Sequence, residues 1–461
     1  MKLRKSSFVQ LISKGEDKYI IFNSYYGNLM KINQKTADLI NYFEKMKDVD
    51  AYVEMYDPIN HEQVYQIIKK CEKLKYLVPY DEKEEIKAIQ EDKYLRYYPE
   101  RLLRFYMTTE CNMACTYCFE KNKVEHTELG EDDIINASRA FIELLKQEDG
   151  DYDLIKINFF GGEPLLKFGT IKKLLPTLKT LFDNFGKPYK FTINTNGILL
   201  NNEIIEWILQ NKVHVYLSID GLKEQHDANR IFKNGEGTFD IVIKKLDMLI
   251  KAASEEFLKK YLTILVTVNN ENIYSARELA FYLKSLGVKN ISLNAAFSCA
   301  LSCDDTNWSI LSEEKLDVFV KEVMKLRNEL YPADVHIGGM WGYIPNRLQR
   351  GGLDFCQAVG HEIGITPDRF LYPCPCTCDN TDYAIGYLEG ANFMFNEKYE
   401  KWKKRNSINI PNCNKCSIGG ICRGGCPGTS ILKGEDIYNP MQCEFWKKFV
   451  RVYLNNYVDY V

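Results

Sequence analysis

Between residues 102 and 335 the sequence alternates between short apolar runs and amphipathic stretches, and this alternation limits the folds that the chain can adopt. The amphipathic stretches place apolar residues three and four positions apart, as Ile134, Ala137 and Phe141 do, so each predicts a helix with one apolar face. Strands separated by such helices predict a parallel sheet with right-handed crossovers. We expect strands over 103–107, 154–160, 189–194, 213–219, 261–268 and 290–295. Six such units predict an α/β fold, a partial (β/α)6 barrel of the triosephosphate isomerase type, with its chemistry at the carboxyl ends of the strands.

The sequence on either side of this region predicts two further domains. Residues 1–95 show three short alternating strands followed by helical stretches, which predicts a small α+β domain of winged-helix-like type. A charged stretch from Asp81 to Tyr97, within a linker to about residue 101, predicts either a linking helix or a solvated connector. After residue 335 the periodicity fades, and cysteine, glycine and proline take over. We therefore expect metal, rather than a large apolar core, to organise residues 336–461.

The balance of charge argues against nucleic acid as a partner. The chain of 461 residues has 60 Lys and Arg against 63 Asp and Glu, so it has no overall positive field to attract phosphates. No apolar run approaches the length of a membrane-spanning helix, and the polar start of the sequence lacks the apolar stretch of a signal peptide. We therefore expect a cytoplasmic protein with no membrane partner.

Fifteen cysteines are many for a chain expected in a reducing compartment, where disulfide frameworks are rare. Three lie within residues 111–118, nine lie from 356 to 443, and three lie elsewhere. This clustering favours metal ligation. Of the remaining three, Cys71 lies on an apolar helical pattern and is expected in a core. Cys299 and Cys303 follow the sixth strand, where they either face the reaction site or lie inertly in a loop.

The first predicted strand runs directly into a loop that contains Cys111, Cys115 and Cys118. A cubane of four irons needs four ligands, so three thiolates leave one iron open to bind an external chelate. The alternative is a zinc site that lacks one ligand, although structural zinc normally closes all four positions. The loop therefore favours an iron–sulfur cluster with one open iron at the catalytic edge of the sheet.

This Cys-x3-Cys-x-aromatic-Cys loop, with Tyr117 as its aromatic residue, resembles the signature of the radical S-adenosylmethionine superfamily, and the resemblance covers about residues 102–310. It implies that S-adenosylmethionine chelates the open iron, with Tyr117 among the residues at the cofactor. One electron, from a partner such as a flavodoxin or ferredoxin, then releases methionine and a 5′-deoxyadenosyl radical. That radical abstracts a hydrogen atom from the substrate.

A second motif, Gly161, Gly162 and Glu163, follows the second strand. The glycines let the backbone approach a ligand, and Glu163 can pair with an ammonium group. The resemblance implies that this motif holds the amino group of the methionine moiety.

Polar residues also follow the third and fourth strands. By resemblance, Asn196 and Ser218 hydrogen-bond the ribose or the carboxylate of the cofactor, and Arg230 pairs with the methionine carboxylate. Each has an ordinary alternative, since Asn-Gly and Asp-Gly are common turn sequences and most arginines are solvated. His226 is expected to be structural and to hold the loop that carries Arg230.

The C-terminal cysteines form another pattern. On spacing alone, Cys413, Cys416, Cys422 and Cys426 also fit a four-thiolate zinc knuckle. With the other cysteines included, the arrangement resembles the SPASM auxiliary-cluster domain of peptide- and protein-modifying radical enzymes. The resemblance implies one cluster on Cys413, Cys416, Cys422 and Cys443, and another on Cys356, Cys374 and Cys426, with its fourth position from Cys376, Cys378, the substrate or nothing. With the catalytic cluster, the expected total is three [4Fe-4S] clusters.

Two residues depart from the pattern of related enzymes. Arg369 stands five positions before Cys374, where the family usually has a glycine. Pro375 follows Cys374, where the anaerobic sulfatase-maturing branch places a catalytic aspartate. The second departure disfavours that branch.

The N-terminal unit resembles the PqqD-like element that binds the leader peptides of ribosomally made natural products. An exposed strand edge can add a peptide strand, with pockets that read alternate side chains. A winged-helix-like domain with another ligand, or with none, is the alternative.

Together these features predict a radical peptide maturase that installs a crosslink in a precursor peptide with a leader. A thioether is the first product expected, because an open auxiliary iron can bind a substrate thiolate. The alternatives are a carbon–carbon crosslink, an epimerisation, a sulfatase-maturing enzyme and, outside enzymes, a zinc-bound recognition protein.

Overall fold

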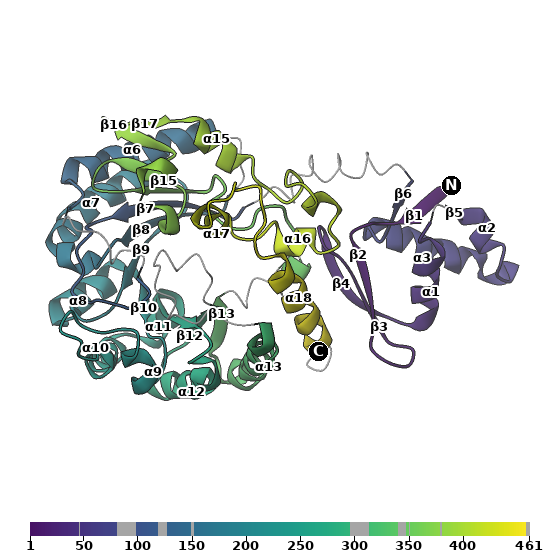
Figure 1. Ribbon diagram of the computed structural model, residues 1–461, viewed down its shortest axis with the longest axis horizontal. Coiled ribbons are helices and arrows are strands. Elements are labelled where there is room, and N and C mark those ends of the chain that lie inside the picture. The colour runs from purple at the N-terminus through teal and green to yellow at the C-terminus, as the bar shows by residue number, and fades with distance from the viewer. Residues whose placement is uncertain are drawn as a thin grey trace.

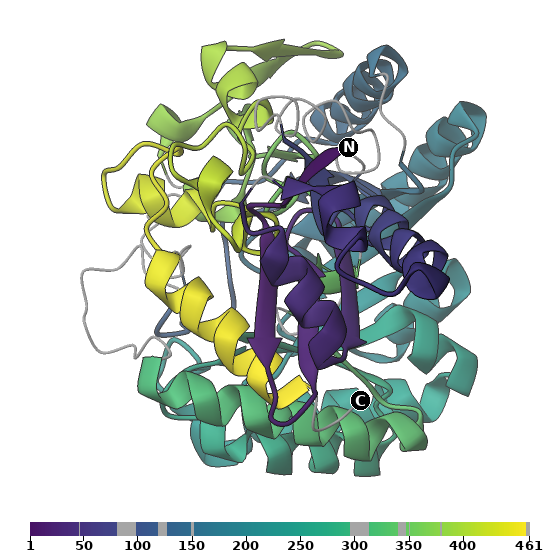
Figure 2. The same cartoon turned by 90° about the vertical axis from the view of Figure 1, so that its right-hand side faces the viewer.

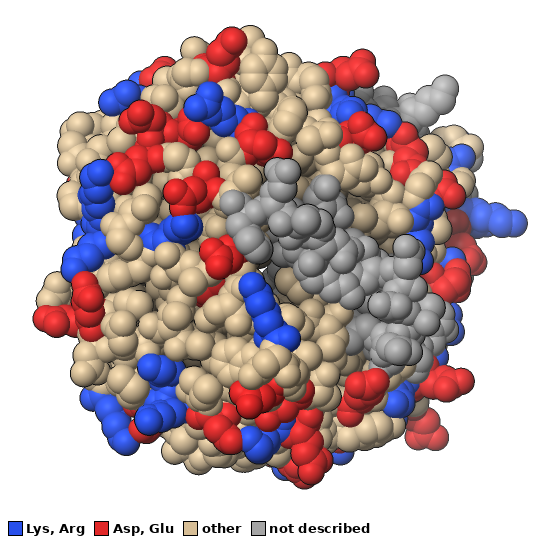
Figure 3. All heavy atoms as spheres, turned by 60° about the vertical axis from the view of Figure 1, so that its left-hand side comes forward, with Lys and Arg blue, Asp and Glu red and all other residues tan. Residues whose placement is uncertain are grey.

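A computed structural model of the chain describes residues 1–45, 47–80, 98–118, 127–148, 152–295, 313–339, 347–349, 351–378 and 380–457. The predicted linking helix from Asp81 to Tyr97 lies outside these residues, as do Cys299 and Cys303. Among the described residues, no helix combines the length and the apolarity that crossing a membrane requires. On the face in Figure 3, basic and acidic side chains are interspersed.

The six predicted strands form the centre of a parallel sheet, which confirms the expected barrel. The strands are β7 (Glu100–Tyr106), β8 (Leu154–Phe160), β9 (Tyr189–Thr195), β10 (His214–Ser218), β11 (Leu262–Val268) and β12 (Asn290–Ala295), each parallel to its neighbour. The helices between and after them are α6 (Glu131–Gln147), α7 (Phe168–Phe185), α8 (Asn202–Asn211), α9 (Lys223–Asp227), α10 (Phe239–Ala252), α11 (Glu255–Tyr261), α12 (Ala276–Leu286) and α13 (Glu313–Leu330). The long helices cover the outside of the curved sheet (Figure 1). The apolar face predicted for α6 is buried, with Ile134, Ala137 and Phe141 in the core.

The sheet extends beyond the six strands at both edges. β13 (His336–Gly339) lies parallel to β12, and β14 (Glu362–Ile365) lies parallel to β7. Three antiparallel strands continue outward from β14, namely β15 (Phe370–Tyr372), β16 (Gly386–Glu389) and β17 (Asn392–Phe395). The cysteine-rich region is therefore joined to the barrel through the same sheet.

The N-terminal unit has the three expected strands, β2 (Val9–Ser13), β3 (Tyr19–Asn23) and β4 (Gly27–Ile32), in one antiparallel sheet with β4 at an edge. A second small sheet contains β1 (Lys2–Lys5), β5 (Lys47–Asp48) and β6 (Leu77–Pro79). The helices are α1 (Gln34–Tyr42), α2 (Val49–Val53) and α3 (His61–Lys73). The apolar faces of α1 and α3 pack with the strands in a core of their own, and Cys71 lies in that core, as predicted.

The C-terminal helices are α15 (Glu397–Lys403), α16 (Gly419–Cys422), α17 (Pro427–Leu432) and α18 (Cys443–Tyr457). α18 packs against α13 of the barrel. In Figures 1 and 2 the N-terminal unit lies beside α18 and the C-terminal loops. One link between them is a hydrogen bond from Lys14 Nζ to the backbone oxygen of Asn455, at 2.6 Å.

The turn between β3 and β4 docks onto the cysteine-rich region through backbone contacts. The amide of Gly352 donates to the backbone oxygen of Tyr25 at 3.1 Å. A Cβ at Gly420 would overlap the backbone oxygen of Ser24, and one at Gly351 would overlap that of Tyr25. Glycine is therefore required at both positions for this close approach.

Candidate active site and cysteine groups

The loop with Cys111, Cys115 and Cys118 begins at the carboxyl end of β7 and is fastened to the segment after α9. The amide of Ala114 donates to the backbone oxygen of Ile231 at 2.8 Å, and that of Thr116 donates to the backbone oxygen of Asn229 at 2.9 Å. Burial, and then the charges of Glu163 and of the other two cysteines, raise the pKa of Cys111 to about 12 when no metal is bound. The three cysteines therefore lie near one another in this loop.

The Gly161-Gly162 segment approaches the start of this loop. Gly162 donates to the backbone oxygen of Thr108, and Glu163 to that of Glu110, both at 2.9 Å. A Cβ at either glycine would overlap one of these oxygens, and Gly161 has a φ of +120°. In the structure, the glycines allow close approach to the cysteine loop.

Glu163 is 1% exposed and lies at the centre of a set of donors. Its carboxylate accepts from Thr195 Oγ1 at 2.7 Å, from the amide of Asn196 at 2.8 Å and from the amide of Leu165 at 3.1 Å. Burial raises its pKa to about 7, although these hydrogen bonds act in the opposite direction. A carboxylate has about four acceptor positions, so this arrangement leaves capacity for an ammonium group.

Asn196 connects the third strand to the cysteine loop. Its Nδ2 donates to Asn112 Oδ1 at 2.8 Å and lies 3.7 Å from Cys111 Sγ. Ser218, the last residue of β10, is half-buried at the same edge of the sheet. Hydrogen bonds to ligating sulfurs influence the potential of a cluster, so Asn196 has a contact that the sequence did not suggest.

Arg230 is paired with a residue that sequence reasoning missed. Its Nε donates to Asp220 Oδ2 at 2.6 Å, and its guanidinium lies 5.4 Å from the ring centre of Tyr117, whose hydroxyl also donates to Asp220 Oδ2. Burial would raise the pKa of Asp220, but the charge of Arg230 and the hydrogen bonds from Tyr117 and Thr267 outweigh it and lower the pKa. The sequence signal for this role was an aspartate directly after a buried strand, at the catalytic edge of the sheet. Because Gly221 follows Asp220, the pair was interpreted as an ordinary turn.

His226 has the structural role predicted for it. Its Nδ1 accepts from the amide of Asp220 at 3.4 Å, and its Nε2 lies 3.0 Å from Thr238 Oγ1, which donates to the backbone oxygen of Arg230 at 2.7 Å. Burial lowers its pKa to about 4. The neutral ring therefore holds the loop that carries Arg230.

The structure brings together the cysteines predicted for one auxiliary cluster. Burial, and then the neighbouring Cys413, Cys443 and Cys416, raise the pKa of the Cys422 thiol to about 12. Cys413 likewise interacts with Cys443 and Cys416. These four thiols therefore lie near one another.

Members of the second predicted group also lie near one another. Burial and then the neighbouring Cys374 raise the pKa of Cys356 to about 12. Cys374 and Cys426 both border Gly428. Within the described ranges, no three Cys, His, Asp or Glu side chains converge tightly enough to hold a single metal ion.

Arg405 is a second residue that sequence reasoning missed. It is fully buried; its Nε donates to the backbone oxygen of Ile437 at 2.6 Å, and its Nη2 donates to those of Gly424 at 2.7 Å and Gly425 at 3.1 Å. Its charge interacts with Cys356 and Cys426 of one group and with Cys413 and Cys422 of the other. A buried cation in this position would offset part of the negative charge of these cysteines when they act as thiolate ligands.

Comparison with known proteins agrees with this geometry. Residues 105–283 match the radical SAM superfamily. The radical SAM cyclopropyl synthase TigE of Paramaledivibacter caminithermalis is 22% identical, over 98% of this chain and 95% of its own length. An uncharacterised protein of Methanocaldococcus jannaschii is 34% identical over 58% of this chain and 82% of its own. A cysteine-type anaerobic sulfatase-maturating enzyme of Clostridium novyi is 23% identical over 74% of this chain and 92% of its own.

The fold also matches a solved structure that includes a counterpart of nearly the whole chain. Streptococcus suis SuiB, bound to its precursor peptide SuiA, superposes with a TM-score of 0.52 at 15% identity and covers 95% of this chain and 98% of its own. At this identity the likeness is one of fold.

Proposed function

Because the chain belongs to the radical S-adenosylmethionine superfamily, we propose that it is a peptide maturase that abstracts hydrogen from a ribosomally made precursor and forms a new bond within it. The observation that carries the proposal is the pairing of the Cys111 loop with two further groups of cysteines in a chain that also has an N-terminal α+β unit. When bound, the catalytic cluster and S-adenosylmethionine would supply the 5′-deoxyadenosyl radical.

The polar residues at the strand ends are proposed to hold the cofactor. Arg230, fixed by Asp220 and Tyr117, would present its remaining guanidinium N–H groups to the methionine carboxylate. Glu163 would accept from the amino group. Asn196 and Ser218 would contact the ribose or the carboxylate of the cofactor. The contact between Asn196 and Cys111 would fix the position of Asn196 relative to the cluster.

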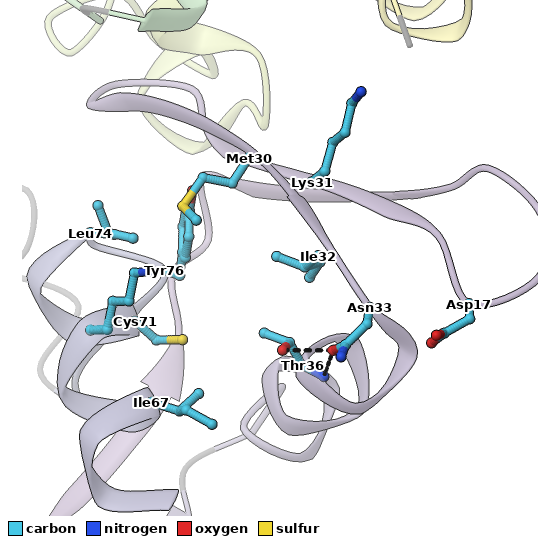
Figure 4. A pocket seen from close by; sticks show the side chains of 11 residues that line it. Asp17, Met30, Lys31, Ile32, Asn33, Thr36, Ile67, Cys71, Leu74 and Tyr76 are labelled. Atoms are coloured by element: carbon cyan, nitrogen blue, oxygen red, sulfur yellow. Dashed lines mark hydrogen bonds between the residues drawn. The ribbon is translucent and has the colours of Figure 1, made fainter. Parts of the chain in front are cut away.

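The N-terminal unit offers a site for the leader. A cavity of about 450 Å³ lies beside the edge strand β4. Met30 and Ile32 of β4 face Ile67 and Cys71 of α3 across it, while Lys31 points away (Figure 4). Alternation along β4 thus gives an apolar pocket next to a strand edge, which is what an added peptide strand requires.

Binding at this pocket can be tested with a matched pair of variants. Ile67→Glu places a charge in the pocket, whereas Ile59→Glu changes an isoleucine that is 87% exposed and outside the pocket. We expect only the first to weaken binding of a fluorescent leader peptide, by about tenfold or more. Equal binding by both variants would place the leader elsewhere.

Two products remain in competition. A thioether requires an iron position that can bind a substrate thiolate. A carbon–carbon bond is favoured by the full-length likeness to a protein named as a cyclopropyl synthase. The sulfatase-maturing alternative shares less of this chain, and Pro375 stands where that branch has its aspartate.

The deciding experiment is a search of the neighbouring reading frames for a short precursor peptide, followed by its anaerobic reaction with the reconstituted full-length enzyme. We expect 5′-deoxyadenosine and a peptide lighter by two hydrogens; alkylation of the product then shows whether a cysteine thiol was consumed. An unchanged mass with deuterium uptake from D₂O would indicate epimerisation instead. Zinc in place of roughly twelve irons per chain would end the enzyme proposal.

A further inference from the structure

Three cysteine side chains border one glycine in the C-terminal region. A Cβ built at Gly428 would lie 3.6 Å from Cys376 Cβ, 3.6 Å from Cys426 Sγ and 3.9 Å from Cys374 Sγ. The Cβ of Cys376 and the sulfurs of Cys426 and Cys374 therefore surround one point beside Gly428. Cys374 and Cys426 are two of the cysteines proposed for one auxiliary cluster, and Cys376 is on the same side of the glycine.

The local fold explains why Cys376 joins this group. A single turn of 3-10 helix, η6 (Pro375–Thr377), begins directly after Cys374. The amide of Thr377 donates to the backbone oxygen of Cys374 at 3.1 Å, and its hydroxyl donates to the same oxygen at 2.9 Å. Pro375 fixes its own φ at the start of the turn. The tight turn thereby returns Cys376 toward the partners of Cys374.

Cys378, the other candidate, has a different environment. It is 5% exposed and packs with Tyr106, Tyr372 and Ala384 in a small apolar cluster. Its Sγ donates to the backbone oxygen of Pro375 at 3.0 Å. A buried thiol that serves as a donor in an apolar cluster is suited to packing.

We propose that Cys376 is the fourth thiolate ligand of the auxiliary cluster held by Cys356, Cys374 and Cys426, and that Cys378 is a core residue. The inference rests on the proposed function, since it requires that this cluster exist. Four protein thiolates fill the ligand positions of a four-iron cluster and leave none for a substrate thiolate. The cluster would then act on the peptide without binding its sulfur, which favours the carbon–carbon product.

The test uses the full-length chain with Cys111, Cys115 and Cys118 all changed to alanine, so that only the auxiliary clusters remain. In this background, Cys376→Ala and Cys378→Ala form a matched pair of cysteine deletions two residues apart. We expect roughly eight irons per chain in the background protein and in its Cys378→Ala variant. The Cys376→Ala variant should either contain about four irons fewer or show an altered electron paramagnetic resonance spectrum. Cys376→Ser, which keeps a possible oxygen ligand, should retain the iron and change the spectrum.

Added thiol provides a second measurement. The electron paramagnetic resonance spectrum of the auxiliary clusters in the background protein should not change when a small thiol is added. If the Cys376→Ala variant retains the cluster, its spectrum should change. A background that already responds, or a spectrum that changes with Cys378→Ala and not with Cys376→Ala, would overturn the assignment. A background with no iron would instead contradict the proposed auxiliary clusters themselves, so the two failures are distinguishable.

Discussion

Tyr25 of the N-terminal unit donates its phenolic hydrogen to the backbone oxygen of Cys413, 3.2 Å away. Tyr25 is fully buried, and it packs with Phe8, Leu353 and Ile408 in a small core that belongs to both ends of the chain. Burial raises the pKa of its hydroxyl, so it remains a hydrogen-bond donor at neutral pH. The proposed leader-binding unit therefore touches the loop that carries auxiliary-cluster ligands.

Gly420→Ala should loosen this docking. The new Cβ would overlap the backbone oxygen of Ser24, which cannot move without displacing the β3–β4 turn. We expect a loss of about 1–3 kcal/mol in stability and faster hydrogen exchange at residues 24–27. Gly169→Ala is the control, because nothing lies within 4 Å of its Cβ position. Unchanged exchange in the Gly420 variant would contradict the tight contact.

Asp220→Asn should weaken the cofactor site. It removes the charge that holds Arg230 and leaves a buried cation without its partner, at a cost of about 3 kcal/mol or more. Binding of S-adenosylmethionine, measured by anaerobic calorimetry, should weaken about tenfold or more. Asp240→Asn, which removes an exposed partner of Lys223, should bind normally. Equal affinities would show that Asp220 does not position Arg230.

Cys115→Ala should abolish formation of 5′-deoxyadenosine and lower the iron content by roughly four per chain, because a cluster loses one of its three thiolates. Cys71→Ala, in the core of the N-terminal unit, should keep the iron and the cleavage activity. Chromatographic detection of 5′-deoxyadenosine after reduction with dithionite provides the measurement. Undiminished cleavage in the Cys115 variant would place the cluster elsewhere.

Arg405→Met should destabilise the cysteine-rich region. The change leaves the buried backbone oxygens of Ile437, Gly424 and Gly425 without their donor, and unpaired buried groups cost about 1–3 kcal/mol each. We expect a lower thermal midpoint and loss of auxiliary iron under anaerobic conditions. Arg139→Met, on the exposed side of α6, is the control. Wild-type iron content and midpoint would argue against this role.

Because burial lowers the pKa of His226, we expect the folded chain to lose stability in mild acid. Its pKa is about 4 in the folded chain, against about 6.5 when unfolded, so the unfolded state binds the extra proton between these values. The stability contributed by the neutral ring is thus complete above pH 6.5 and falls by about 3 kcal/mol as the pH drops to 4. His226→Gln should flatten this part of the anaerobic melting profile, whereas His61→Gln should leave it unchanged.

The barrel was predictable because each of its strands is a short apolar run, and each of its long helices places apolar residues three and four positions apart. The 102–335 pattern contains the positions that become β7–β12, and the predicted apolar face of α6 is the buried one. β13 and β14 have only four residues each, too few for a period to be visible, and they join the sheet through partners far away in sequence.

The site was predictable where ligands recur at fixed spacing and not where partners are distant. The spacing around Cys111 predicted three cysteines that lie near one another, whereas the grouping of Cys413 with Cys443 came from the family resemblance and not from spacing. Arg405, by contrast, sits in no motif, and its role depends on carbonyl groups brought close by folding. The role of Asp220 likewise depends on Arg230, which reaches it only after α9 has turned the chain.

The hydrogen bond between Tyr25 and Cys413 spans 388 positions of sequence, which sets an order of events during biosynthesis. Domains generally fold as they leave the ribosome, beginning with the N-terminal one. The N-terminal unit has its own core and can form early, but the surface on which Tyr25 rests exists only after the last third of the chain has been made. The Tyr25 side chain therefore stays exposed to solvent until the cysteine-rich region has been synthesised and folded. Its burial would show that both ends of the chain have assembled.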